Sequence, residues 1–306
     1  MNIGTKKAFN ELIEVLFNYD SDNKIYHYTS IEALYSIIKT NSLRLTNSMY
    51  MNDRDEFNIY LENFLEICKG LQSEGKINSE IIEEMISTFE MNLSNHSLQN
   101  PYKHASYFIF STSLNNNQIP MWNNYSESTG ICIEFDRSKL CELFSDCIVN
   151  LKNSCFDNYK CLYNYKDKKE LILEVMNIFM LKFYEDRKEG IREFWNFMTK
   201  YGYMFKSEQF QYEDEYRYLL SLDSDYVDGI DSDLNHNEIT VDYYVTQNTI
   251  RPCIFINPKK KLPITKILVS PLSKNETVLS GITRFLISNG YDIEVEHKTF
   301  SYRKDY

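Results

Sequence analysis

Two glutamates and an arginine stand close together in the run Glu213-Asp214-Glu215-Tyr216-Arg217. Read as a strand, this run puts Glu213, Glu215 and Arg217 on one face, because side chains alternate along a strand. A carboxylate pair held beside a guanidinium can stabilise a cation that develops in a transition state. A solvated edge strand with a surface Glu–Arg pair accounts for the same residues, so both interpretations stay open.

A histidine lies at the end of a predicted strand, in Tyr26-His27-Tyr28-Thr29-Ser30. A helix is expected to start directly after it. Side chains at such a junction can face a cleft, and the first turn of the helix offers free N–H groups to an anion. The alternative is an aromatic cluster between strands, in which the imidazole is simply hydrogen-bonded in place.

Two aromatic residues, Trp122 and Tyr125, lie three positions apart in a predicted short helix over 118–125. They therefore share one helix face. Such a pair usually packs in a core, but it can also form a wall against which a flat heterocycle stacks. A predicted strand over 129–135 follows, and it begins beside Gly130.

A second polar run, Ser111-Thr112-Ser113, ends a predicted buried strand over 104–112. Ser and Thr at the end of a strand commonly form turns, so this run alone predicts no site. The acidic run over 52–56 contains residue types that bind metals. It is better explained as a helix N-terminus, where acidic side chains complement the helix dipole.

Short strands separated by helices are expected to position these residues. The spacing of apolar residues predicts strands over 24–28, 43–45, 104–112, 129–135, 216–220, 264–269 and 293–295, and a strand-rich stretch over 240–257. It predicts helices over 5–19, 54–70, 77–94, 118–125, 137–145, 168–203 (in two pieces) and 275–288. A further helix is expected after the strand over 24–28, with a capping box formed by Thr29 and Glu32. The stretch over 155–163 is ambiguous, and 221–238 is expected to be a loop.

The order of these elements predicts an α+β fold with mixed or mostly antiparallel strands and helical insertions. The chain lacks G-x-G-x-x-G, which argues against a doubly wound dinucleotide-binding sheet. We expect a single domain over 1–306, with a core over about 24–303 and helical insertions over about 54–95 and 168–203.

Composition narrows the class of protein. The net charge of −11 counts against a general nucleic-acid binder, which usually needs a basic face. The seven cysteines are odd in number and contain no C-x-x-C, so we expect reduced thiols and no zinc site. With no signal-like segment and no apolar run of about 18 residues, the chain is expected to be cytoplasmic and to bind no membrane.

Taken in order, the motifs resemble a bacterial family known as domain of unknown function 2971. The matching stretches are KIYHYTSIEALYSIIKTNSLRL, MNDRDEF, FSTS with PMWNNYSESTGICIEF, YEDEYRYL, and ITKILVSPLS through SYR. They run over about residues 24–303. This family label carries no activity.

A more distant resemblance is to ADP-ribosyltransferases of the diphtheria-toxin and poly-ADP-ribose type. The counterparts here are His27, Tyr125 ahead of the strand at Gly130, and Glu215. The arginine-modifying branch instead uses Ser-Thr-Ser and Glu-x-Glu, which resemble 111–113 and 213–215. Tyr28 stands where the His-type branch prefers Gly, and His27 stands where the arginine-modifying branch has Arg. The sequence thus mixes features of both branches, which leaves the target type open.

The resemblance implies an enzyme that uses NAD as a substrate, without a metal, and breaks the bond between nicotinamide and ribose. Glu215 would stabilise the oxocarbenium-like transition state and hold a ribose hydroxyl. His27 would bind the other ribose, and Tyr125 would stack on the nicotinamide. Glu213 would orient the acceptor. The remaining NAD-binding residues would be the backbone of Tyr28 at the carboxamide, with Thr29, Ser111, Trp122 and Arg217.

The resemblance leaves three functions open as alternatives. The first is transfer of ADP-ribose to a protein, nucleic acid or small molecule. The second is NAD glycohydrolysis with water as the acceptor. The third is a binding or sensing module that kept the fold and lost the chemistry. A role as a toxin or phage-defence effector, with a cognate regulator or antitoxin, is implied by the same resemblance.

Overall fold

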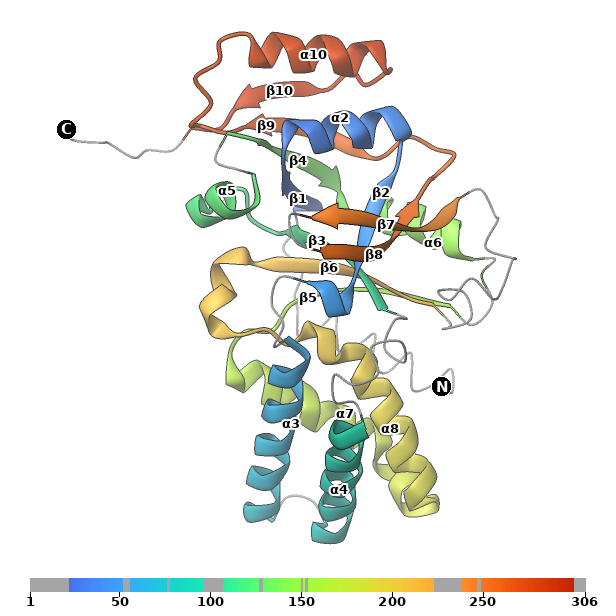
Figure 1. The fold of residues 1–306 in the computed structure, drawn as a ribbon. Helices are drawn as coiled ribbons and strands as arrows, with labels where there is room; N and C mark the ends of the chain where they lie inside the picture. The colour runs from blue at the N-terminus through green and yellow to red at the C-terminus, as the bar shows by residue number, and fades with distance from the viewer. Residues whose placement is uncertain are drawn as a thin grey trace, which may run out of the picture. The chain divides into compact units, whose positions relative to one another are not determined.

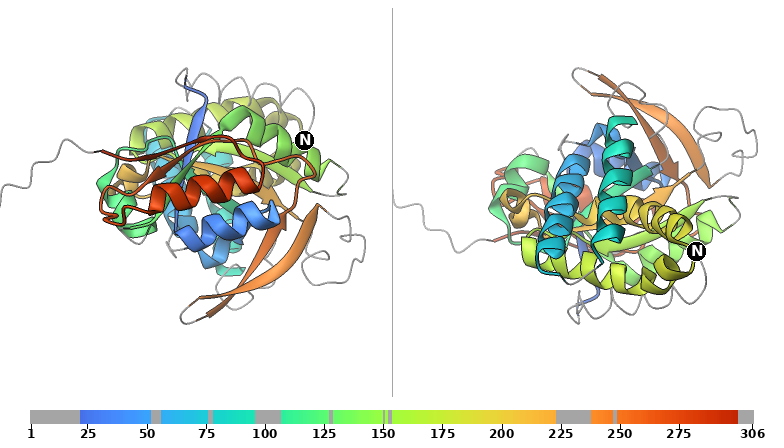
Figure 2. Two further views of the ribbon diagram at one scale, coloured as in Figure 1. Left: turned by 90° about the horizontal axis from the view of Figure 1, so that it is seen from above. Right: turned by 90° about the horizontal axis from the view of Figure 1, so that it is seen from below.

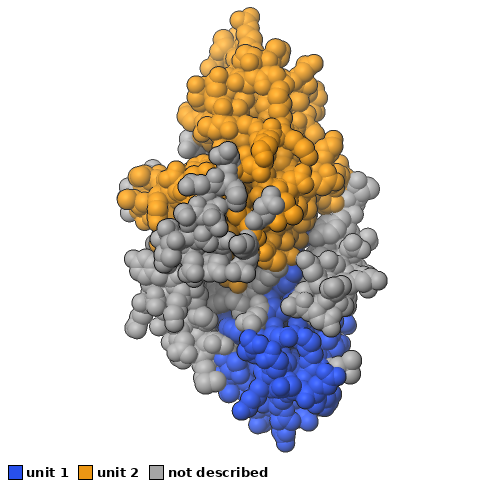
Figure 3. Space-filling view, turned by 90° about the vertical axis from the view of Figure 1, so that its right-hand side faces the viewer, with its two compact units in different colours: residues 1–21, 52–102, 159–211 blue, residues 22–51, 103–158, 212–306 orange. Residues whose placement is uncertain are grey.

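The computed structural model describes residues 22–51, 56–75, 78–95, 107–126, 129–149, 151, 154–222, 238–246 and 249–299. The expected helix over 5–19, the helix start at 52–55 and most of the expected loop over 221–238 lie outside these residues. The described residues form two compact units, which Figure 3 colours separately. Unit 1 contains described residues of 52–102 and 159–211, and unit 2 contains those of 22–51, 103–158 and 212–306. Both predicted helical insertions fall in unit 1, whereas folding as a single domain stays a prediction.

Long helices build unit 1: α3 (Glu56–Ser73), α4 (Ser79–Asn95), α7 (Tyr165–Glu185) and α8 (Arg187–Tyr201) (Figure 1). Their core is rich in aromatic rings. The ring of Phe194 lies 5.8 Å from that of Phe64 and 5.7 Å from that of Phe179. Asp186 separates α7 from α8 and caps α8 by accepting a hydrogen bond from Glu189 N at 3.1 Å. The predicted division of 168–203 into two helical pieces is therefore confirmed.

A sheet of ten strands forms the core of unit 2. Its strands are β1 (Lys24–Thr29), β2 (Leu43–Asn47), β3 (Tyr107–Ser113), β4 (Ile131–Asp136), β5 (Cys155–Lys160), β6 (Glu215–Ser221), β7 (Ile239–Thr246), β8 (Thr249–Ile256), β9 (Ile264–Val269) and β10 (Glu294–His297). Of the strand pairs with a described register, only β9 and β10 are parallel. They are joined through α10 (Val278–Ser288), since a parallel connection needs a crossover. This confirms the α+β class with mostly antiparallel strands.

The sheet divides at β3. Along one edge β3 pairs with β6 over its whole length. The other edge is shared by two strands: β2 pairs at Phe108 and Ile109, and β1 pairs at Ser113. One branch continues from β1 through β4, β9 and β10, and the other continues from β2 through β8 and β7. Three of the four strands at this fork, β1, β3 and β6, carry the polar motifs found in the sequence.

Helices α2 (Ile31–Thr40) and α10 lie side by side (Figure 2). The ring of Tyr35 stacks on that of Phe285 with 5.2 Å between their centroids. The first turn of α2 is capped by Ser30, whose Oγ accepts a hydrogen bond from Ala33 N at 3.2 Å. The expected capping box starting at Thr29 is therefore wrong by one residue. Thr29 is instead the last residue of β1.

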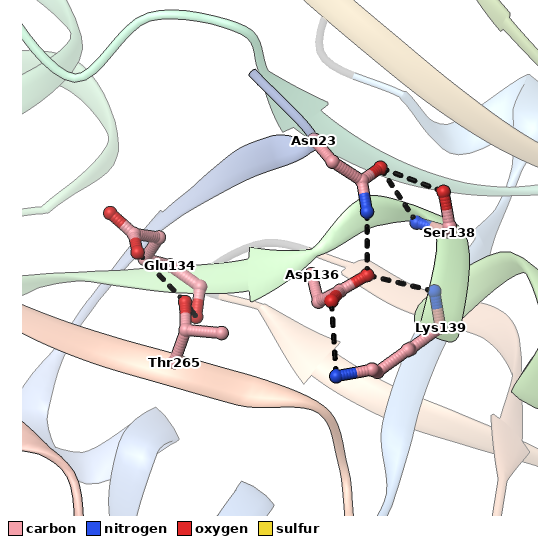
Figure 4. A network of polar contacts seen from close by, with 6 residues as sticks. All are labelled: Asn23, Glu134, Asp136, Ser138, Lys139 and Thr265. Carbon is pink, nitrogen blue, oxygen red and sulfur yellow. Dashed lines mark hydrogen bonds and ion pairs between the residues drawn. The ribbon is translucent and has the colours of Figure 1, made fainter. Parts of the chain in front are cut away.

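A polar network at the other end of β1 fixes where this strand begins (Figure 4). The amide of Asn23 donates to Asp136 Oδ1 at 2.8 Å and accepts from the Ser138 hydroxyl at 2.8 Å. Asp136 also caps α6 (Arg137–Ile148) by accepting from Lys139 N at 3.0 Å. The paired strands β1 and β4 are thus anchored together where β1 begins and β4 ends.

Candidate functional site

The centre of the candidate site is an ion pair within β6. Arg217 donates from Nε to Glu215 Oε1 at 2.8 Å and from Nη2 to Oε2 at 2.9 Å. Glu215 is 4% exposed and Arg217 is fully buried. Strand β6 has β3 on one side and β5 on the other, so it is no edge strand. The interpretation as a solvated surface pair is wrong, and this bidentate pair is desolvated, where electrostatic interactions are strongest.

Glu213 departs from the expected strand alternation. It ends the 3-10 helix η4 (Glu208–Glu213), and Asp214 then adopts a left-handed backbone with φ 42° before β6 begins. Its carboxylate is buried and accepts a hydrogen bond of 2.6 Å from the Tyr125 hydroxyl. Its backbone carbonyl accepts from the Ser113 hydroxyl at 2.6 Å. Glu213 is therefore tied to α5 (Ile119–Tyr125) and to β3.

The serines of β3 share a face with the ion pair. Ser111 lies directly opposite Arg217, and Ser113 lies directly opposite Glu215. Residues opposite each other in an antiparallel pair project from the same face. The Ser111 hydroxyl is buried, and no hydrogen-bond partner is described for it. A buried hydroxyl beside a buried ion pair is the type of group that a bound ligand can satisfy.

His27 lies at the fork of the sheet. Strand β1 pairs with β3 at Tyr26 only, and beyond this point His27 Nδ1 hydrogen-bonds the Ser111 carbonyl at 3.1 Å. The imidazole also packs at 4.7 Å on the ring of Phe110. Within the described residues it makes no hydrogen bond to either glutamate. Its hydrogen bond to Ser111 connects it to the residue that lies opposite Arg217 in the β3–β6 pair.

Burial lowers the pKa of His27 to about 4, with a smaller contribution from the positive charge of Arg44 and an opposing one from the Ser111 hydrogen bond. The imidazole is therefore neutral at pH 7. A carbonyl oxygen can only accept a hydrogen bond, so Nδ1 must carry the proton. This leaves Nε2 as a hydrogen-bond acceptor.

The predicted aromatic pair divides into a buried and an accessible ring. Trp122 is 1% exposed and packs edge-on against Tyr28 at 5.1 Å, inside an apolar cluster. Tyr125 and Tyr212 pack against this cluster and are only partly buried. Tyr125 is therefore partly accessible, whereas Trp122 is buried in the cluster against which Tyr125 packs.

Residues not foreseen from the sequence complete the surroundings of this cluster. The Tyr28 hydroxyl donates to the Asn115 carbonyl at 2.9 Å, and Asn115 N donates to Ser113 Oγ at 3.1 Å. The ammonium of Lys298 donates to Asn116 Oδ1 at 2.7 Å. The run Asn115-Asn116-Asn117 after β3 is the feature of the sequence that could have indicated this loop. No feature of the sequence indicates Lys298, because 182 positions separate it from Asn116.

Gly130 has a steric reason for its position. A Cβ added there would lie 2.4 Å from the backbone carbonyl oxygens of both Ser126 and Thr29. Its own N–H donates to the Ser126 carbonyl at 2.6 Å. Only glycine allows the turn after α5 to approach the end of β1 this closely.

Two further properties concern metals and membranes. The seven cysteines are free, and burial raises the pKa of Cys253 to about 11. Among the described residues, no group of three His, Cys, Asp or Glu side chains could hold a metal ion. No helix in the described part of the chain has both the length and the apolar character needed to cross a membrane.

Residues 121–218 match the model of a family described as protein of unknown function (DUF2971). The matched segment runs from α5 to β6 and includes Tyr125, Glu213, Glu215 and Arg217, whereas His27 lies outside it. No curated protein and no solved structure gives a significant match. The resemblance to the DUF2971 family, predicted from the motifs, is thereby confirmed for residues 121–218 of this chain.

Proposed function

We propose that this chain is an ADP-ribosyltransferase-like enzyme that cleaves the nicotinamide–ribose bond of NAD and transfers ADP-ribose to an acceptor. One observation carries the proposal. Three motifs far apart in sequence, at His27, 111–113 and 213–217, come together on the adjacent strands β1, β3 and β6. Together with Tyr125, these are the motifs on which the resemblance to ADP-ribosyltransferases rests.

Glu215 is the proposed catalytic carboxylate. Cleavage of a glycosidic-type bond passes through an oxocarbenium-like state, and a nearby carboxylate stabilises the developing positive charge. Its burial supports this role, because a fixed negative charge acts most strongly where water is excluded. Arg217 would hold the carboxylate in a fixed orientation by its two hydrogen bonds.

The proposed NAD contacts follow from the atoms that remain available. Nε2 of the neutral His27 would accept a hydrogen bond from a ribose hydroxyl. Strand β1 separates from β3 after Tyr26. Its backbone groups near Tyr28 and Thr29 would therefore bind the carboxamide. Tyr125, fixed by Glu213, would stack on the nicotinamide ring. The unpaired Ser111 hydroxyl would bind a further ribose oxygen.

A second candidate, a binding or sensing module without chemistry, is favoured by a different observation. Both carboxylate oxygens of Glu215 already accept hydrogen bonds from Arg217. If Arg217 holds Glu215 permanently, the pair is a structural element of the sheet. An NAD glycohydrolase is the same proposal with water in place of the acceptor.

Nicotinamide release from NAD separates these candidates. A transferase releases nicotinamide and labels an acceptor, and a glycohydrolase releases it together with free ADP-ribose. Binding of NAD without release would support the module. A role as a toxin or phage-defence effector would show as growth arrest on expression that is relieved by Glu215→Gln, and harmless expression of the unaltered chain would contradict it.

A further inference from the structure

Two arginines on neighbouring strands share a face of the second branch of the sheet. Arg44 on β2 lies opposite Phe255 of β8, and Arg251 lies four residues before Phe255 on β8. Residues two or four apart on a strand project from the same side, and directly opposed residues share that side. Arg44 and Arg251 therefore project from one face. Figure 1 shows β2, β8 and β7 side by side in this branch.

Tyr244 of β7 links the two arginines. It lies directly opposite Arg251 in the β7–β8 pair. Its ring lies under the Arg44 guanidinium, with 3.8 Å from Cζ to the ring centroid, and its hydroxyl hydrogen-bonds Thr46 Oγ1 at 3.3 Å. The cation–π contact holds Arg44 in place while leaving its N–H groups available.

Neither arginine has an anionic partner within the described residues. Arg217, by contrast, is paired with Glu215. The Nε of Arg251 is buried without a hydrogen-bond acceptor. Buried polar groups in folded proteins are nearly always hydrogen-bonded, so such a group calls for an explanation. The exposed carboxylate on this face, Asp242, accepts a hydrogen bond from Tyr243 N and forms no described ion pair with either arginine.

We propose that Arg44 and Arg251 bind the diphosphate group of a nucleotide. A guanidinium is planar and presents paired N–H donors that match two phosphate oxygens. Two guanidinium groups joined by one tyrosine suit two linked phosphates better than one. The site rests on the geometry of β2, β7 and β8, so it stands whether or not NAD is cleaved at Glu215.

Isothermal titration calorimetry of the full chain, which measures its affinity for pyrophosphate, ADP and adenosine, tests this site. We expect pyrophosphate and ADP to bind and adenosine to bind far more weakly. Arg44→Ala should weaken the affinity for both anions about tenfold or more, the loss expected for a charge-assisted hydrogen bond. The affinity of Arg44→Lys should fall between those of the unaltered chain and of Arg44→Ala, because lysine keeps the charge and loses the planar donor pair.

Two controls make the result specific. Lys260→Ala removes one positive charge from an exposed ion pair with Asp146 and should leave binding unchanged. Glu215→Gln should also leave pyrophosphate binding unchanged, which separates this proposal from the one on NAD cleavage. Because Arg44 is exposed, its variants should keep the melting temperature of the unaltered chain. Equal affinities in Arg44→Ala and Lys260→Ala, or adenosine binding as tightly as ADP, would overturn the proposal.

Discussion

The hydroxyl of Tyr125 donates a hydrogen bond of 2.6 Å to Oε1 of Glu213, and so joins α5 to the residue that precedes the turn into β6. The two residues are 88 positions apart. The bond fixes the accessible aromatic ring of the candidate site relative to the strand that carries Glu215. It also explains why a glutamate that is 3% exposed can remain buried.

Removing either partner of this bond should destabilise unit 2. Tyr125→Phe removes the hydroxyl that donates to the Glu213 carboxylate. A hydrogen bond to a charged group contributes roughly 1.5–3 kcal/mol. A double-mutant cycle with Glu213→Ala, which removes the acceptor, measured by urea unfolding, should therefore give a coupling energy of about 1 kcal/mol or more. Strictly additive effects would show that the two side chains do not interact in solution.

Gly130→Ala should be among the most damaging small substitutions in the chain. The added methyl group would clash with two backbone carbonyls, those of Ser126 and Thr29, which cannot move aside as a side chain can. We expect a loss of about 1–3 kcal/mol or more in the free energy of unfolding. Gly281→Ala in α10 is the matched control, since no atom other than those of its chain neighbours and its own helix backbone lies within 4 Å of the added Cβ. Similar stabilities for the two variants would contradict this account.

The helix cap of α2 gives a prediction that discriminates between adjacent residues. Ser30→Ala should lower the free energy of unfolding by about 1 kcal/mol, because Ala33 N loses its acceptor. Thr29→Val should have a much smaller effect, since Thr29 is a strand residue and makes no capping bond. Thermal unfolding of both variants measures these two losses of stability. A larger loss of stability for Thr29→Val than for Ser30→Ala would support the capping box expected from the sequence.

Stability should depend on pH through His27. The unfolded chain protonates this residue near pH 6.5, whereas the folded chain does so only near pH 4. Unfolding therefore takes up a proton between about pH 4 and about pH 6.5. The stabilisation that the neutral His27 contributes to the folded chain is complete above about pH 6.5 and is lost as the pH falls through about 4. The full effect is about 3 kcal/mol. His27→Gln should lose this component, and an identical pH dependence in both proteins between pH 4 and 7 would contradict it.

Local patterns in the sequence predicted most of the sheet and helices of unit 2. Strands such as β1 and β4 alternate or concentrate apolar residues strongly enough to be recognised, and the pair Glu215–Arg217 was expected from its spacing of two. The error at Glu213 has a physical cause. Asp214 adopts a left-handed backbone, so the chain turns between the two glutamates and strand alternation does not apply.

Long-range contacts could not be predicted in this way. Nothing local indicates that β3 is shared by β1, β2 and β6, or that Tyr125 reaches Glu213. The pairing of Arg44 with Tyr244 joins positions 200 residues apart, and its two members carry no motif. Such contacts arise from packing of the whole sheet, which a single sequence does not encode in any short segment.

The most direct test of the proposed chemistry compares two buried glutamates of the same sheet. Glu215 faces Ser113, whereas Glu134 is 5% exposed, accepts a hydrogen bond of 2.8 Å from Thr265 (Figure 4) and belongs to β4. Glutamine keeps the shape and one acceptor oxygen in each case. Melting temperatures of Glu215→Gln and Glu134→Gln first establish that both variants are folded.

The decisive measurement is then the rate of nicotinamide release from NAD by the unaltered chain and by both variants. We predict release by the unaltered chain and by Glu134→Gln, and a loss of about 100-fold or more in Glu215→Gln, the size expected when a group that stabilises transition-state charge is removed. Equal rates in folded Glu215→Gln and Glu134→Gln, or no release by the unaltered chain in the presence of a cell extract that supplies acceptors, would contradict the proposed chemistry at Glu215.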